Sequence, residues 1–106
     1  MIRRLSLVRK LPALTRAEFV ERWTGEHVEI AKRLPGLRGY VIHVLEGDDP
    51  PFDGIAITTF DSREDAERAF ADPALAEGLA RTRDDFAALV EVRYAQEIVI
   101  VEEEQP

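Results

Sequence analysis

The sequence predicts an α+β fold in which helices cover one face of a four-stranded antiparallel sheet. Three observations predict it: short segments of alternating apolar and polar residues, two stretches with helical spacing and clear start signals, and their order along the chain. That order is β-α-β-β-α-β, which is typical of a ferredoxin-like domain. At 106 residues the chain has the length of one domain, so we expect a single ferredoxin-like domain over residues 1–106.

The first strand and the first helix are the most clearly marked elements. Residues 2–9 alternate as a strand does. Thr15 then begins a capping box with Glu18, in which each side chain accepts a backbone N–H of the other residue. Apolar residues recur at helical spacing as far as Leu34, which predicts one amphipathic helix. Pro35–Gly36 should end it, because proline cannot continue the helix and glycine accepts a left-handed turn.

Two further strands are expected in the middle of the chain, over Gly39–Leu45 and Ile55–Phe60. Between them lies Glu46–Pro51, a run of turn-forming residues that predicts a loop. Asp61 or Ser62 is expected to cap the next helix, because a short polar side chain there can accept a free backbone N–H.

The last third of the chain predicts a helix and a final strand. Asp72–Pro73 should break the preceding helix, and a new one is expected from about Ala74 to Ala88. The final strand is expected within Val90–Val101, with Ile98–Val101 as its most apolar part.

Both faces of the predicted sheet are apolar. In the second strand Tyr40, Ile42 and Val44 lie on one side and Val41, His43 and Leu45 on the other. In the third strand Ile55 and Ile57 lie on one side and Ala56 and Phe60 on the other. Helices can cover only one of them, and a solvated second face should alternate to polar residues. We therefore expect a homodimer in which two sheets pack face to face.

Composition excludes several classes of function. With 14 basic and 21 acidic residues the net charge is −7, so binding to nucleic acid is not expected. The chain has no cysteine, which excludes thiolate metal sites and a cysteine nucleophile. No apolar run is long enough to span a membrane, and the N-terminus does not have the form of a signal peptide, so we expect a cytoplasmic protein without membrane contact. Acidic residues gather at Glu46–Asp49 and Glu102–Glu104, which we interpret as a solvated loop and tail.

His27 and Tyr40 are the candidate catalytic residues. His27 follows Trp23 by one helical turn, on the stripe that faces the sheet, so it is either a general base or acid or a core-edge histidine bonded to a backbone carbonyl. Tyr40 is either a donor to a ligand oxygen or a half-buried sheet residue. His43 lies three residues further along the strand and should point to the dimer face, unless a bulge turns it into the pocket. Two histidines without a third ligand make a poor metal site, and no metal is expected.

The segment FVERWTGEHVEIAKRLPGLRGYVIH, from Phe19 to His43, resembles the EthD family. An aromatic residue, Trp23, is followed by His27 and then by the run Leu34 to Tyr40 (LPGLRGY). The DGIA sequence that begins at Asp53 and an Asp-Phe pair before the last strand also match, so the resemblance covers nearly the whole chain.

The resemblance implies a dimeric α/β-barrel and a small protein without a cofactor. Such proteins act on lactones, aromatic compounds or polyketides as isomerases, dehydratases or cyclases. In the muconolactone-type isomerases of the family, the residues matched by His27 and Tyr40 belong to the active site. Family members often carry a glutamate where this sequence has Ile57, so the resemblance implies a less polar pocket here.

We therefore expect an enzyme in which His27 moves a proton on a small cyclic or aromatic molecule and Tyr40 stabilises the enolate oxygen. Trp23, Phe19 and His43 are the expected substrate-binding residues. Three alternatives stay open: a cofactor-independent monooxygenase of the same barrel fold, a non-catalytic accessory or structural dimer in a catabolic or biosynthetic pathway, and a haem-binding barrel with a histidine as axial ligand.

Overall fold

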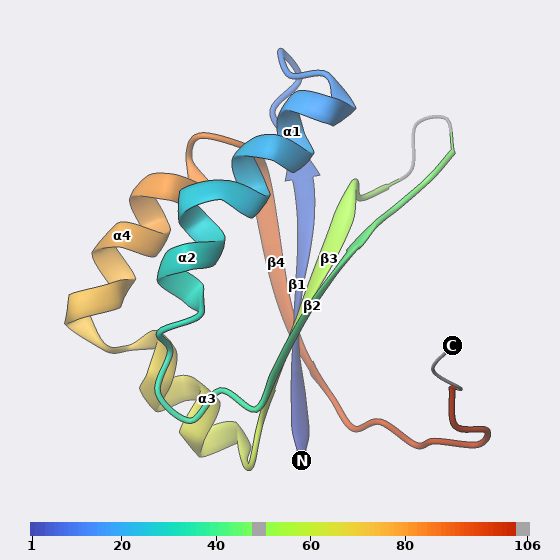
Figure 1. The fold of residues 1–106 in the computed structure, drawn as a ribbon, viewed down its shortest axis with the longest axis vertical. Helices are drawn as coiled ribbons and strands as arrows, with labels where there is room; N and C mark the ends of the chain where they lie inside the picture. Colours follow the sequence, from blue (N-terminus) through green and yellow to red (C-terminus); the bar gives the residue numbers. More distant parts are fainter. Residues whose placement is uncertain (48–50, 104–106) are drawn as a thin grey trace.

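The computed structural model describes residues 1–47 and 51–103 and confirms the ferredoxin-like fold (Figure 1). Four antiparallel strands form one sheet in the order β2-β3-β1-β4, and the helices lie on one side of it. The elements are β1 (Ile2–Lys10), α1 (Arg16–Arg22), η1 (Trp23–His27), α2 (Val28–Ala31), β2 (Gly39–Val44), β3 (Gly54–Phe60), α3 (Arg63–Phe70), α4 (Pro73–Arg83) and β4 (Ala87–Ala95). In this part of the chain no helix is both long and apolar enough to cross a bilayer.

The first helix begins and ends as expected but is not continuous. Its capping box is present: the Glu18 backbone N–H donates to Thr15 Oγ1 at 3.1 Å, and the Thr15 backbone N–H donates to Glu18 Oε1 at 2.9 Å. A π-helical turn, η1, separates α1 from α2, and within it Gly25 departs from helical geometry with ψ −121°. Gly36 has φ 79°, the left-handed conformation that ends the segment.

Ser62, one of the two residues expected to do so, caps α3, and Asp72, which was expected only to break the preceding helix, caps α4. The last two elements end earlier than expected. The last helix does not continue to Ala88, because it stops at Arg83 and the chain is already in β4 at Ala87. The strand also ends before its most apolar segment. Its pairing with β1 stops at Ala95 opposite Arg3, because β1 has almost no residues left to pair with.

The apolar segment Ile98–Val101 therefore lies outside the sheet. Its side chains are between 62% and 86% exposed, so it contributes nothing to the core of this chain. Parts of two other predicted segments, residues 48–50 of the loop and Glu104 of the tail, lie outside the described residues.

The strand register assigns every side chain of the sheet to one of two faces. On the inner face, which the helices cover, one row across the sheet is Tyr40, Thr58, Arg4 and Tyr94. The corresponding row on the outer face is Val41, Ile57, Leu5 and Arg93. The predicted separation of the two faces is thus correct.

The core on the inner face consists of two clusters. One joins α2, α3 and α4 to the end of β3 around Phe60, and the other joins α1 and η1 to β1 around Phe19, Trp23 and Phe86. Tyr40 packs against both clusters, so it marks the boundary between them.

Candidate active site

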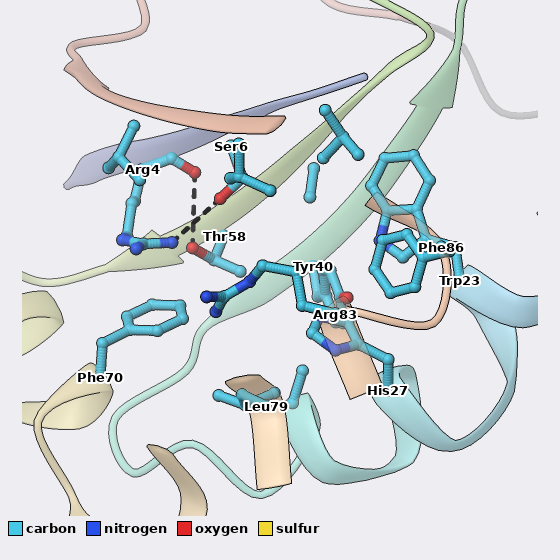
Figure 2. Close-up of a pocket in the computed structure, with 15 residues that line it drawn as sticks. Arg4, Ser6, Trp23, His27, Tyr40, Thr58, Phe70, Leu79, Arg83 and Phe86 are labelled. Carbon is cyan, nitrogen blue, oxygen red and sulfur yellow. Dashed lines mark hydrogen bonds between the residues drawn. The ribbon is translucent and has the colours of Figure 1, made fainter. Parts of the chain in front are cut away.

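A cavity of about 150 Å³ lies between the two core clusters, bounded by the inner face of the sheet and by the helices (Figure 2). The sheet contributes Arg4, Ser6, Val8, Tyr40, Ala56, Thr58, Val90 and Val92. The helices and the segments that follow them contribute Trp23, His27, Ala31, Phe70, Leu79, Arg83 and Phe86. A space of this size accepts a molecule of about one six-membered ring.

One wall of the cavity is aromatic. The rings of Trp23 and Phe86 stack with centroids 5.7 Å apart and planes 17° apart, and both side chains are only 1% exposed. Phe19 packs on Trp23 at 5.2 Å, but it is fully buried and supports this wall without lining the cavity. The flat, rigid surface that results suits a planar ring.

His27 is held in one orientation by Thr82. Its Nδ1 lies 2.7 Å from Thr82 Oγ1, and the threonine hydroxyl itself donates to the carbonyl of Gly78 at 2.8 Å. Because a hydroxyl has a single proton, Thr82 Oγ1 must accept from His27, which assigns the proton of the imidazole to Nδ1. Nε2 then carries the lone pair, and no described residue donates a hydrogen bond to it. Phe86 fixes the ring further through an edge contact at 5.0 Å.

Burial keeps His27 neutral. Loss of solvation, together with the nearby positive charge of Arg83, lowers the pKa of His27 from 6.5 to about 4. The same ring borders a hollow at the surface between η1 and the end of α4, so it lies between the cavity and solvent. A neutral imidazole in this position can accept a proton at Nε2.

Tyr40 reaches the cavity from β2. Burial raises the pKa of its phenol to about 12, so the hydroxyl keeps its proton at any physiological pH. Within the described residues this hydroxyl has no hydrogen-bond partner, and it is therefore available as a donor. His27 and Tyr40, which the sequence singled out, thus line one cavity (Figure 2).

His43 and Ile57 lie elsewhere. The register of β2 places His43 opposite Ile55 on the outer face, where it is exposed and outside the cavity. No bulge interrupts β2 to turn it inward. Ile57 is also on the outer face, between Val41 and Leu5, so the expectation that this residue makes the pocket less polar is wrong.

The family model for the EthD domain matches residues 11–103. The chain belongs to the EthD family. An EthD family protein from Bacillus halodurans has a TM-score of 0.74 at 20% identity, with 92% of this chain and 100% of that chain covered. SnoaB, a cofactor-independent oxygenase from Streptomyces nogalater, has a TM-score of 0.68 at 16% identity, with 96% and 97% covered. A dimeric ferredoxin-like protein of unknown function from Thermobifida fusca has a TM-score of 0.68 at 18% identity, with 89% and 88% covered. No curated protein matches the chain.

The EthD-family site of this protein also contains residues that sequence reasoning missed. Arg4 and Arg83 line the cavity, and Thr82 orients His27. Arg4 could have been found, because the alternation of β1 puts its charge on the same face as Ser6 and Val8, where an apolar residue is expected. Arg83 and Thr82 carry no such signal, since they resemble any polar residues near the end of a helix. Among the described residues, no group of three or more His, Asp or Glu side chains could hold a metal ion.

Proposed function

We propose that this EthD-family protein is an enzyme that moves a proton within a small one-ring substrate, with His27 as base and Tyr40 as hydrogen-bond donor. The observation that supports it most is the bond between His27 Nδ1 and Thr82 Oγ1. This bond fixes the tautomer in which Nε2 is basic, in a ring that lines the cavity. A histidine with a purely structural role would not need to line a cavity.

The reaction that these groups support is abstraction of a proton next to a carbonyl. Nε2 of His27 takes the proton from carbon, and the electron pair moves toward the carbonyl oxygen to form an enolate. The Tyr40 hydroxyl donates a hydrogen bond to that oxygen, which stabilises the developing charge. Return of the proton to a different carbon completes an isomerisation. Alternatively the enolate re-forms the carbonyl and expels a hydroxyl from the β-carbon, which takes the proton from His27 and leaves as water, and this completes a dehydration.

The low pKa of His27 is compatible with this role. In the free protein, burial and Arg83 disfavour the imidazolium. Negative charge that develops on the substrate beside the ring favours the imidazolium, so the imidazole becomes a stronger base as the reaction proceeds. Trp23 and Phe86 keep water from that side of the cavity, which strengthens the interaction between the two charges.

The test is proton exchange between substrate and solvent. Small lactones, cyclic ketones and phenols are incubated with the protein in D₂O, and deuterium uptake is followed by NMR. We expect uptake for one of these classes and a loss of about 10² or more in rate for His27→Gln, the range measured for general bases. His43→Gln is the matched control, because it removes an imidazole from the outer face, and we expect it to keep the wild-type rate.

Other results of these measurements would favour a different function. Oxygen consumption that depends on His27, with no deuterium uptake, would favour a monooxygenase that acts on phenols. An unchanged rate in His27→Gln, or no turnover of any class, would favour the accessory dimer. Loss of rate in His43→Gln as well would mean that the outer face contributes to the site.

We also infer that the outer face of the sheet binds a second copy of the chain. Leu5 and Ile57 lie side by side there, Val41 beside them is 51% exposed, and the helices leave this face uncovered (Figure 1). The T. fusca protein of the same fold is dimeric, which supports the inference. Light scattering should give the mass of a dimer for the wild type and of a monomer for Val41→Glu. Ala17→Glu, on the exposed side of α1, should stay dimeric, and a wild type that is monomeric at all concentrations would contradict the inference.

A further inference from the structure

The cavity is positively charged although the protein is acidic. The net charge of the whole chain is −7, yet the lining of the cavity includes Arg4 and Arg83 and no aspartate or glutamate. The two arginines come from opposite sides, Arg4 from β1 in the sheet and Arg83 from the last turn of α4. Figure 2 shows the ends of both side chains directed into the same space, next to Phe70.

Neither of these two arginines forms an ion pair with a carboxylate of the described residues, and both line the cavity, whereas the other arginines without an ion pair, Arg9, Arg16, Arg22 and Arg33, lie outside it. Six arginines on the surface form ion pairs with carboxylates: Arg3, Arg38, Arg63, Arg68, Arg81 and Arg93. Arg4 instead donates to Ser6 Oγ at 3.0 Å and lies 3.6 Å above the centroid of the Phe70 ring. Arg83 forms neither an ion pair nor a side-chain hydrogen bond with a described residue.

The Arg4 guanidinium is held in place before any ligand arrives. Stacking on Phe70 fixes its plane, and the hydrogen bond to Ser6 fixes its rotation. Thr58 is its neighbour in the same row and donates to the Arg4 carbonyl at 3.4 Å. An arginine fixed in this way loses little conformational entropy when it binds a planar anion.

The two positive charges also disfavour each other. Burial lowers the pKa of Arg4, the neighbouring Tyr94 phenol raises it in part, and the positive charge of Arg83 lowers it further. Arg83 acts in the same direction on His27. A bound anion relieves this repulsion, because it supplies the countercharge that the described residues do not. The anion also offsets the positive charge of Arg83, which is one of the two causes of the low pKa of His27. Binding therefore raises the pKa of His27 and makes it a stronger base.

We propose that Arg4 and Arg83 form a subsite for the carboxylate of a small one-ring acid, with the ring against the aromatic wall of Trp23 and Phe86. The N–H donors of a guanidinium match the two coplanar oxygens of a carboxylate, and the attached ring adds contacts with the aromatic wall that an inorganic anion cannot make. A cavity of about 150 Å³ leaves room for one ring and little more. The proposal deepens the proposed function by naming its substrate class, but it concerns binding and does not depend on turnover.

The test compares benzoate with benzamide, which has nearly the same shape and no charge. Binding to the wild-type protein is measured by calorimetry and by thermal shift. We expect benzoate to bind and to stabilise the protein, and benzamide to bind at least tenfold more weakly, because it makes no charge-assisted hydrogen bonds. Equal binding of the two compounds, or no binding of benzoate, would overturn the proposal.

Three variants locate the site. Arg83→Gln should weaken benzoate binding at least tenfold, whereas Arg81→Gln, two residues away on the exposed side of α4, should bind as the wild type does. Arg4→Gln should match Arg83→Gln, and if it does not fold, Arg83→Gln alone still decides, because Arg83 is half exposed and not fixed by a hydrogen bond. Wild-type affinity in Arg83→Gln would overturn the proposal.

Two further measurements separate the possible causes of failure. Inorganic phosphate should bind much more weakly than benzoate, and equal affinity with the same dependence on Arg83 would make the subsite a general anion site and overturn the carboxylate assignment. Turnover of the compound classes named above is measured beside benzoate binding. If benzoate binds with the expected dependence on Arg83 but no class of compound is turned over, the proposed function fails while the carboxylate subsite stands.

Discussion

Acidification is expected to destabilise the folded protein through His27. In the folded state the pKa of His27 is about 4, whereas the ordinary value is 6.5. Below pH 6.5 the imidazole therefore binds a proton in the unfolded chain but not in the folded protein. Each decrease of one pH unit in this range lowers the free energy of unfolding by about 1.4 kcal/mol. The contribution of His27 to stability is complete above pH 6.5, falls as the pH decreases and reaches its lower limit near pH 4.

Between about pH 7.5 and about pH 5 this linkage amounts to roughly 2 kcal/mol for a fully desolvated ring, and to about 1–2 kcal/mol for one that keeps some contact with water. Urea unfolding at the two pH values measures it in the wild type and in His27→Gln, which has no imidazole to titrate. Carboxylates titrate alike in both proteins, so the difference between them isolates His27. The same pH dependence in wild type and His27→Gln would refute the reasoning.

Two further substitutions test the packing and the orientation of the site. Gly54→Ala places a Cβ in steric overlap with Cζ3 of Trp23, so the buried indole must shift, and we expect the free energy of unfolding in urea to fall by about 1–3 kcal/mol. Gly39→Ala, whose Cβ meets only an ordinary contact at 3.5 Å, is the control, and equal stability of the two variants would mean that Trp23 is free to move. Thr82→Val removes the acceptor of the His27 Nδ1 proton at nearly constant volume, which should cost about 1–3 kcal/mol and favour the Nε2–H tautomer. Nitrogen NMR of the ring reports the tautomer directly, and an unchanged spectrum would contradict the assigned role of Thr82.

Local signals predicted the elements that depend on local chemistry. The capping box at Thr15 and the turn at Gly36 involve backbone groups within a few residues of each other, so the sequence contains everything that decides them. The faces of the strands were also predictable, because successive side chains of a strand point to opposite sides whatever lies next to it. This predicted that Tyr40 and His43 lie on opposite faces of the sheet, which the strand register confirms.

The sequence predictions were wrong where pairing with a segment distant in sequence sets the end of an element. The most apolar segment, Ile98–Val101, reads as a strand, but β4 can extend only as far as β1 pairs with it, and that pairing ends at Ala95. The expected helix to Ala88 fails for a related reason, since Lys10 of β1 already pairs with Ala87. Hydrophobicity and helical spacing contain no information about the length of the neighbouring strand.

The same distinction applies to the site. The sequence by itself determined that His27 would face the sheet and that Tyr40 and His43 would point to opposite faces of the sheet, because periodicity in a helix and in a strand fixes those directions. Only the tertiary structure decided which distant residues contact these side chains. His27 is oriented by Thr82, 55 residues away, and Arg4 of the first strand meets Arg83 of the last helix across one cavity. Burial, countercharge and pKa arise from such contacts between distant segments, so the chemistry of the site became visible only when the chain was folded.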